Sequence, residues 1–381
     1  MPQQPTLLFL TNSTEALRCY WQPLLANMQA AGWHVLCCVP SAAPTVGQAP
    51  FVPAGCTVLH YPLDAKGCSP LRDARTLWAL RNILKQTKPD ILVASTIKSV
   101  IYGGIAAQLT AVPHYCAIIT GLGYAFEGGR LGKRLLRFVA SRLYSLALHA
   151  ATLIFFQNSA DVEEFRTRGI VRPQHRLALC KGAGVDCVHF SPVPAVVHRP
   201  VFLLMARLLV AKGIACYAEA AHRLKQQYPL ARFCLLGAAM QGRGALNMAD
   251  VQRWQRCGDI EYWGACRDVR PFVRQASVLV LPSWREGTPA SILEGMAMGR
   301  PAVVSDVPGC RDAVREGING FLVPPHDNVA LALAMEKFIR EPSLIERMGQ
   351  AARRIACEEF EAERVAAGMV AQIQQACGIR A

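Results

Sequence analysis

The sequence lacks several patterns that mark common classes of protein. Its 15 cysteines include no C-x-x-C pair and no grouping with histidine at zinc-site spacing, which argues against a zinc module. No apolar run reaches the roughly 18 residues of a membrane-spanning helix. No G-x-G-x-x-G motif follows the first apolar run, which disfavours a dinucleotide-dependent dehydrogenase.

Acidic residues are scarce relative to basic ones. The chain has 27 Asp and Glu against 41 Lys and Arg, a net charge of +14. This excess favours an anionic partner, which could be nucleic acid, anionic lipid or a diphosphate substrate. The first residues show neither a basic segment nor a long apolar one, and the cysteine count is odd. We therefore expect a cytoplasmic protein without a signal peptide.

Short apolar runs alternate with helical patterns along the chain, which is typical of doubly wound parallel sheets. In the first half we expect strands at 6–10, 33–39, 57–61, 90–94, 114–119 and 152–156, with helices at 15–31, 71–86 and 99–109. In the second half we expect strands at 201–206, 232–236, 261–264, 277–281 and 302–305, with helices at 212–227, 268–275, 291–298, 328–340 and 342–359, and a last helix that ends near 377.

The segment PSWREGTPASILEGMAMGRPAVVSD, residues 282–306, contains the most candidate binding residues. It places Glu286 on the loop after a predicted strand and Glu294 about one turn into a helix. In open parallel sheets ligands bind at the carboxyl ends of strands. Glu286 can accept hydrogen bonds from a sugar, Glu294 can reach the diol of a ribose, and the helix N-terminus attracts phosphate. The expected donor-binding residues of this loop and helix start are Gly287, Thr288, Pro289, Ala290, Ser291 and Ile292.

A basic pair in ARLLVAKG follows the strand at 201–206. Arg207 can hold a phosphate with two hydrogen bonds, and Lys212 acts as a point charge. Alone, an R-x4-K pair is most often two surface residues. In the same half as the two glutamates, it predicts a site for a departing diphosphate. Because these cations can take the place of a metal and no D-x-D element lies in a suitable loop, we expect no metal ion or cofactor.

The segment EGTPASILEGMAMGRPAVVSD followed by GINGFLVPPHD resembles family 4 of the retaining glycosyltransferases, which have the GT-B fold. The resemblance implies that Glu286 faces the donor sugar, that Glu294 faces the ribose, and that Arg207 and Lys212 contact the diphosphate. It implies that the base lies near 264–268, where Arg267 is a weaker candidate. Gly295 departs from the family, which usually has alanine there; we expect it to be tolerated in a closely packed helix.

The first half contains candidates for the acceptor site. The TGLGYAF segment resembles the subgroup that acts on undecaprenyl-diphosphate-linked sugars in bacterial glycan assembly, and Thr120 stands where many members have histidine. Asn12 and Ser13 follow the first strand and are equally well explained as turn and helix-capping residues. The expected acceptor residues are Asn12, Ser13, Thr120, Gly121 and Gly123.

Residues 130–148 predict an amphipathic helix. Its basic face is expected to hold Arg130, Lys133, Arg134 and Arg137. Its apolar face is expected to pack inward and to hold Leu131, Leu135, Phe138, Val139, Leu143 and Leu146. The basic side chains are either simply solvated or face an anionic membrane surface, and the net charge favours the second interpretation.

Together these observations predict two Rossmann-like domains that face a cleft. We expect an acceptor domain at 1–185, a nucleotide-sugar domain at 186–358 and a C-terminal helix at 359–381 that crosses back to the first domain. The resemblance implies retaining transfer of a hexosyl or N-acetylhexosaminyl group, from a UDP-linked donor to a lipid-linked saccharide, at the inner face of the plasma membrane.

Two other functions stay open. One is another GT-B-fold enzyme, such as a sugar-nucleotide epimerase or a phosphorylase. The other is a non-catalytic basic module for membrane or nucleic acid, which explains the net charge but not the combination of Arg207, Lys212, Glu286 and Glu294. We expect no nucleic-acid partner.

Overall fold

The computed structural model of the protein describes residues 4–41, 53–64, 67, 69–122, 131–242 and 244–379, with the side chains of 131–133 excepted. The chain forms two compact units. Unit 1 contains Met1–Ala183 and Glu363–Ala381, and unit 2 contains Gly184–Ala362.

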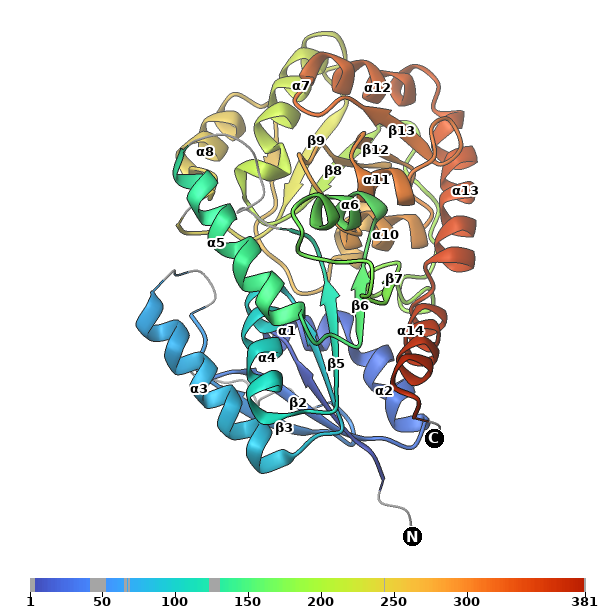
Figure 1. Ribbon diagram of the computed structural model, residues 1–381. Coiled ribbons are helices and arrows are strands. Elements are labelled where there is room, and N and C mark those ends of the chain that lie inside the picture. Colours follow the sequence, from blue (N-terminus) through green and yellow to red (C-terminus); the bar gives the residue numbers. More distant parts are fainter. Residues whose placement is uncertain are drawn as a thin grey trace. The chain divides into compact units, whose positions relative to one another are not determined.

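Unit 1 is built on a parallel sheet of seven strands in the order β3-β2-β1-β4-β5-β6-β7 (Figure 1). The strands are β1 Thr6–Leu10, β2 His34–Pro40, β3 Thr57–Tyr61, β4 Ile91–Ser95, β5 His114–Ile119, β6 Leu153–Phe156 and β7 Leu177–Leu179. The helices are α1 Thr14–Tyr20, α2 Gln22–Ala30, α3 Pro70–Thr87, α4 Ile97–Thr110, α5 Leu131–Leu148, α6 Ser159–Thr167 and α14 Ala362–Cys377.

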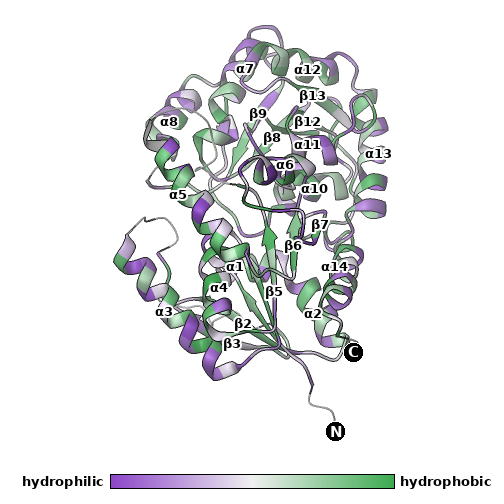
Figure 2. Ribbon diagram, in the orientation of Figure 1, coloured by the Kyte–Doolittle hydropathy of each residue, from purple (hydrophilic) through white to green (hydrophobic). Residues whose placement is uncertain are grey.

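Helices cover both faces of this sheet, because its strands are apolar on both sides. Strand residues alternate between two cores. Leu8 and Leu10 pack with residues of α3, α4, α5 and α6, whereas Leu7 and Phe9 pack with residues of α1, α2 and α14. Figure 2 shows these strands coloured hydrophobic along most of their length. The C-terminal helix α14 thus belongs to the core of unit 1.

One predicted helix of unit 1 is two helices. We expected a continuous helix over 15–31, but α1 ends at Tyr20 and α2 begins at Gln22, with Trp21 between them at φ −106° and ψ 0°. Pro23 stands in the first turn of α2. Proline lacks an N–H and crowds the preceding turn, so it is accepted there but interrupts a longer helix.

Unit 2 has a parallel sheet of six strands in the order β10-β9-β8-β11-β12-β13. The strands are β8 Val201–Met205, β9 Arg232–Leu236, β10 Glu261–Tyr262, β11 Val278–Leu281, β12 Ala302–Ser305 and β13 Gly320–Val323. The helices are the 3-10 turn η2 Val210–Lys212, α7 Ile214–Gln227, α8 Met248–Arg256, α9 Arg270–Gln275, α10 Ala290–Ala297, α11 Pro308–Ala313, α12 Asn328–Arg340 and α13 Ser343–Glu359.

The two units therefore share one architecture, as predicted: a parallel sheet between two layers of helices. The predicted strands at 6–10, 57–61, 114–119, 232–236 and 302–305 have the observed bounds. Within the described part of the chain, no helix is both long enough and apolar enough to cross a bilayer.

Candidate functional site

The main candidate site lies in unit 2, where the order of its strands reverses. β8 is the first strand of this sheet; β9 and β10 lie to one side of it, and β11, β12 and β13 lie to the other. β8 and β11 are therefore neighbours, with Leu203 beside Leu279. Loops that leave such a pair of strands turn to opposite faces and leave a crevice between them. The segment with Arg207 and Lys212 follows β8, and the segment with Glu286 follows β11.

Lys212 and Glu286, from these two segments, contact one another. The Lys212 Nζ lies 2.5 Å from the Glu286 Oε1, and the two side chains are 22% and 10% exposed. A charged pair this sheltered from water is screened less than a surface pair. The sequence predicted that each residue would contact a ligand, and the structure additionally pairs them with one another.

Close backbone approaches hold the two loops together. Gly213 has φ +70°, and a Cβ there would lie 2.0 Å from the Pro282 carbonyl oxygen. The Trp284 N–H donates to the Ala211 carbonyl at 2.9 Å. Only glycine satisfies both the positive φ and the missing space at Gly213. The turn after η2 therefore fixes Lys212 against the loop that carries Glu286.

A second glycine supports the same loop from below. A Cβ on Gly309, at the start of α11, would lie 1.3 Å from the carbonyl oxygen of Gly287. The loop of Gly287 thus rests directly on the backbone of α11. The sequence analysis missed this residue, because its role depends on a contact between segments that are separate in the chain.

Helix α10 begins at Ala290, within the predicted donor-binding stretch. Its N-cap residue is Pro289, and no side chain caps the helix. The first N–H groups of an α-helix have no partner inside the helix. Those of Ala290 and Ser291 are therefore available to an anionic group, and the helix dipole favours such a group there.

Glu294 lies on α10 in a largely apolar setting. Burial raises the pKa of its carboxyl from 4.5 to about 7. Desolvation penalises the charged form, and no cation among the described residues offsets this penalty. Such a carboxyl changes between its protonated and ionised forms near neutral pH. In its ionised form it can accept hydrogen bonds from a diol.

Gly295 packs as the sequence predicted. A Cβ there would lie 1.9 Å from Cδ1 of Leu279, a fully buried residue of β11. The helix therefore lies close on the sheet at the point where it presents Glu294.

The remaining donor-site candidates are more exposed. Arg207 follows β8 and is exposed, and across the described residues it has no ion pair. Arg267 is also exposed. Among the described residues neither arginine forms an ion pair, so both can reach a ligand.

Two serines at the same sheet edge escaped the sequence analysis. Ser283 follows β11 and Ser305 ends β12. Both are fully buried, and neither hydroxyl has a hydrogen-bond partner among the described residues. A serine in an apolar strand gives no sequence signal, because small hydroxyl residues are common at strand ends.

Unit 1 places its acceptor candidates at the carboxyl edge of its own sheet. Asn12 and Ser13 follow β1, and the Ser13 hydroxyl accepts from the Ala16 N–H at 2.9 Å as the N-cap of α1. Thr120 and Gly121 follow β5, where Gly121 has φ +124°. Gly123 lies outside the described residues. Ser13 thus has the capping role that the sequence left as an alternative.

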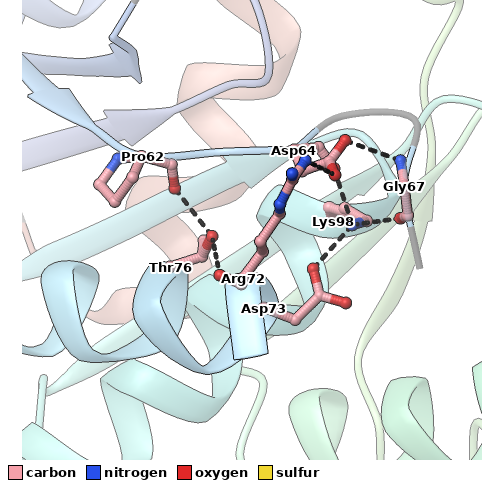
Figure 3. Close-up of polar contacts among 7 residues, drawn as sticks. All are labelled: Pro62, Asp64, Gly67, Arg72, Asp73, Thr76 and Lys98. Atoms are coloured by element: carbon pink, nitrogen blue, oxygen red, sulfur yellow. Dashed lines mark hydrogen bonds and ion pairs between the residues drawn. The ribbon is translucent and has the colours of Figure 1, made fainter. Parts of the chain in front are cut away.

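The lysine at the start of α4 is held by a neighbouring loop (Figure 3). The Lys98 Nζ donates to the carbonyls of Asp64 and Gly67 at 2.8 Å each and pairs with Asp73 at 2.7 Å. Arg72 pairs with the Asp64 carboxylate at 3.0 Å. Lys98 therefore ties the loop after β3 to α3 and α4.

The orientation predicted for α5 is wrong in part. We expected Leu135, Phe138, Val139 and Leu146 to pack inward, but their side chains are 67%, 58%, 45% and 53% exposed. Leu143 packs against the core as predicted, together with Ala140, Tyr144 and Leu148. The sequence holds two apolar stripes on one helix, and hydropathy alone does not say which of them faces the sheet. Arg134 is exposed and Arg137 half-buried, whereas Arg130 and the Lys133 side chain lie outside the described residues.

The fold matches that of known glycosyltransferases. Sucrose-phosphate synthase from Thermosynechococcus elongatus superposes with a TM-score of 0.82 at 19% identity, over 97% of this chain and 98% of that one. HepE of Anabaena in complex with UDP-glucose superposes with a TM-score of 0.75 at 17% identity, over 97% and 99%. Both likenesses concern the fold, which is of the GT-B type.

Family models and curated relatives agree with this class. Residues 17–181 match the glycosyl transferase 4-like domain, and residues 199–341 match the glycosyl transferases of group 1. The chain belongs to this glycosyltransferase family and is a glycosyltransferase.

Two curated relatives are similar over most of the chain. One is the N,N'-diacetylbacillosaminyl-diphospho-undecaprenol alpha-1,3-N-acetylgalactosaminyltransferase of Campylobacter jejuni, 27% identical over 70% of this chain and 72% of that protein. The other is the UDP-Gal:alpha-D-GlcNAc-diphosphoundecaprenol alpha-1,3-galactosyltransferase of Escherichia coli, 27% identical over 70% of each chain.

Proposed function

We propose that the protein transfers a hexosyl or N-acetylhexosaminyl group, with retention of configuration, from a UDP-linked donor to a lipid-linked saccharide in bacterial surface glycan assembly. The observation that carries the proposal is the Lys212–Glu286 pair beside the uncapped start of α10. This arrangement places a cation, the first N–H groups of a helix and a carboxylate that can bind a sugar at one edge of the sheet. The diphosphoundecaprenol substrates in the names of the two relatives support the acceptor.

The donor would lie along these groups in order. The N–H groups of Ala290 and Ser291 bind the diphosphate, together with Lys212 and Arg207. Glu294 accepts hydrogen bonds from the ribose diol, and Glu286 accepts them from the sugar. The helix holds these amides in place before the donor arrives, and together with the two cations they stabilise the charge that develops on the leaving diphosphate.

In the reaction, the bond between the anomeric carbon and the diphosphate oxygen breaks. The acceptor hydroxyl forms the new bond on the same face, and its proton passes to the departing diphosphate. Glu286 holds the sugar while positive charge develops on its ring. The cations supply the charge compensation that a metal ion supplies in other enzymes, so we propose a metal-independent reaction.

We further propose that unit 1 binds the acceptor through Asn12, Thr120 and Gly121, and that the protein works as a peripheral enzyme at the inner face of the plasma membrane. The exposed apolar and basic side chains of α5 support this placement. A sugar-nucleotide epimerase is the alternative within the fold, and it would act on the donor without an acceptor.

A thermal-shift panel with UDP, GDP, ADP and their sugar conjugates tests the donor site. A ligand that binds only the folded protein raises its melting temperature with increasing concentration. We expect a shift with the UDP series that Lys212→Ala removes. Lys225→Ala, the same change at a half-buried lysine in the last turn of α7, should keep it. Shifts with the GDP or ADP series alone would contradict the UDP assignment, and no shift with any nucleotide would contradict the donor site.

A further inference from the structure

Unit 1 contains a basic groove, a cavity lined by residues of α5 and of the end of α6. The cavity has a volume of about 680 Å³ and lies between α5 and the end of α6. Four guanidinium groups line it, from Arg134, Arg137, Arg142 and Arg168. Arginine is the side chain best suited to phosphate, because its planar group donates two parallel hydrogen bonds.

Two of these four arginines have no ion pair among the described residues. Arg168 pairs with Glu164 at 2.7 Å. Arg134 and Arg142 form no ion pair within the part of the chain that the structure describes. The Arg142 guanidinium lies over the ring of Phe138, with 5.2 Å to the ring centroid. The cavity therefore combines unpaired positive charge with an exposed aromatic ring.

An apolar strip borders the cavity along α5. Successive residues of a helix are rotated by roughly 100°. Residues 134, 137, 141 and 145 then point into the cavity, while Leu135, Val139 and Leu146 form the next stripe around the helix. Phe138 and Arg142 lie on the border between them. Leu135, Val139 and Leu146 are 67%, 45% and 53% exposed. Figure 2 shows both hydrophilic and hydrophobic stretches on α5.

We propose that this groove binds the phosphate of an anionic phospholipid at the membrane surface, with the apolar strip of α5 resting in the adjoining acyl-chain boundary. A phosphate beside an apolar surface is the chemistry of a phospholipid, and the groove offers the complementary charge and apolar area side by side. The inference deepens the peripheral-membrane part of the proposed function and rests on it.

The position of the groove favours a bilayer lipid over the reacting substrate. α6 begins just after the carboxyl end of β6, and the groove is lined by residues at its other end, Thr167 to Gly169. A helix rises about 1.5 Å per residue. On its α6 side, the groove thus lies roughly one α6 length away from the sheet edge where substrates of this fold bind.

Vesicle co-sedimentation of the full chain tests this inference. Vesicles of phosphatidylcholine alone are compared with vesicles that also contain phosphatidylglycerol. We expect Arg134→Gln/Arg142→Gln to lower affinity for the anionic vesicles by roughly tenfold or more. The control Arg166→Gln/Arg256→Gln removes the same charge from exposed positions outside the groove and should stay within about twofold of the unaltered protein. Equal losses in both variants, or no loss in the groove variant, would overturn the proposal.

Two further experiments test the contribution of the apolar strip and the source of the phosphate that the groove binds. Leu135→Ser/Val139→Ser should weaken vesicle binding while its salt dependence stays unchanged; unaltered binding would refute the role of the strip. Inorganic diphosphate at constant ionic strength should fail to release the protein from anionic vesicles, and release would mean that the groove binds a free phosphate compound instead. Nucleotide-induced thermal shifts should be normal in all these variants, so a failure here is distinct from a failure of the donor site.

Discussion

Lys212 and Glu286 are 74 positions apart in the chain, yet the amine of one lies 2.5 Å from the carboxylate of the other. The loops that carry them leave two neighbouring parallel strands at the point where the strand order reverses. Each side chain holds the other in place. A donor diphosphate would compete for the lysine and leave the carboxylate free for the sugar, so donor binding would rearrange this pair.

Gly309→Ala tests how strictly the loop of Gly287 is supported. The added methyl would lie 1.3 Å from the Gly287 carbonyl oxygen, so the loop must move. We expect the nucleotide-induced thermal shift to be lost and the free energy of unfolding to fall by about 1–3 kcal/mol. Thermal-shift and urea-unfolding measurements on the same samples check both effects.

The matched control for this change is Gly368→Ala in α14, where the added methyl meets nothing within 4 Å. It should be neutral or stabilise the protein by up to about 1 kcal/mol. Normal nucleotide binding by Gly309→Ala would show that the loop does not need its present position.

Glu294→Gln should separate stability from donor binding. The carboxyl has a pKa of about 7 in the folded protein and an ordinary value of 4.5. The folded state therefore binds more protons between these values, and this group makes the protein less stable as pH rises from 4.5 to 7. Glutamine is neutral at every pH, so the variant should be more stable than the unaltered protein at pH 8, by about 1–3 kcal/mol.

Urea unfolding at pH 5 and pH 8 measures this difference, which should be much smaller at pH 5. Glu346→Gln, an exposed carboxylate on α13, should have much less effect. The affinity of Glu294→Gln for nucleotide should nevertheless fall, because an amide accepts hydrogen bonds from a diol less strongly than a carboxylate does. Equal stability of the variant and the unaltered protein at pH 8 would contradict the burial cost assigned to Glu294.

Removal of metal ions by a chelator should not change the rate of sugar transfer. If Arg207, Lys212 and the start of α10 stabilise the leaving diphosphate, sugar transfer in excess EDTA should proceed at about the untreated rate. The rate of product formation with and without EDTA measures this. Loss of transfer in EDTA, with recovery on adding Mg²⁺ or Mn²⁺, would show that a metal ion does the work assigned to the two cations.

The fold could be predicted largely from local sequence. Fully buried parallel strands are continuous apolar runs, so strands such as Thr57–Tyr61 and Ala302–Ser305 stand out with their observed bounds. The predictions of secondary structure and of helix orientation failed where tertiary contacts determine the outcome. The helix expected over 15–31 breaks around Trp21, and α5 turns a different stripe toward the sheet than hydropathy suggested.

The residues of the candidate site could be proposed from the sequence, but the contacts that hold them together could not. The spacing of Glu286 and Glu294 and of Arg207 and Lys212 is visible in the sequence. The pairing of Lys212 with Glu286, the contact of Gly309 with Gly287, and the raised pKa of Glu294 all depend on which segments meet in space. No local pattern encodes those meetings, since each joins loops or helices from different parts of the chain.

The most direct test of the account is the rate of sugar transfer by Glu286→Gln, measured with a UDP-sugar and a diphospholipid-linked saccharide acceptor. We expect transfer to fall by about 10²-fold or more, because the neutral amide side chain no longer stabilises the positive charge on the sugar ring. UDP should still raise the melting temperature of the variant, since Lys212 and the start of α10 are intact. Transfer at the rate of the unaltered protein would contradict the assignment of Glu286 and its surroundings as the catalytic site.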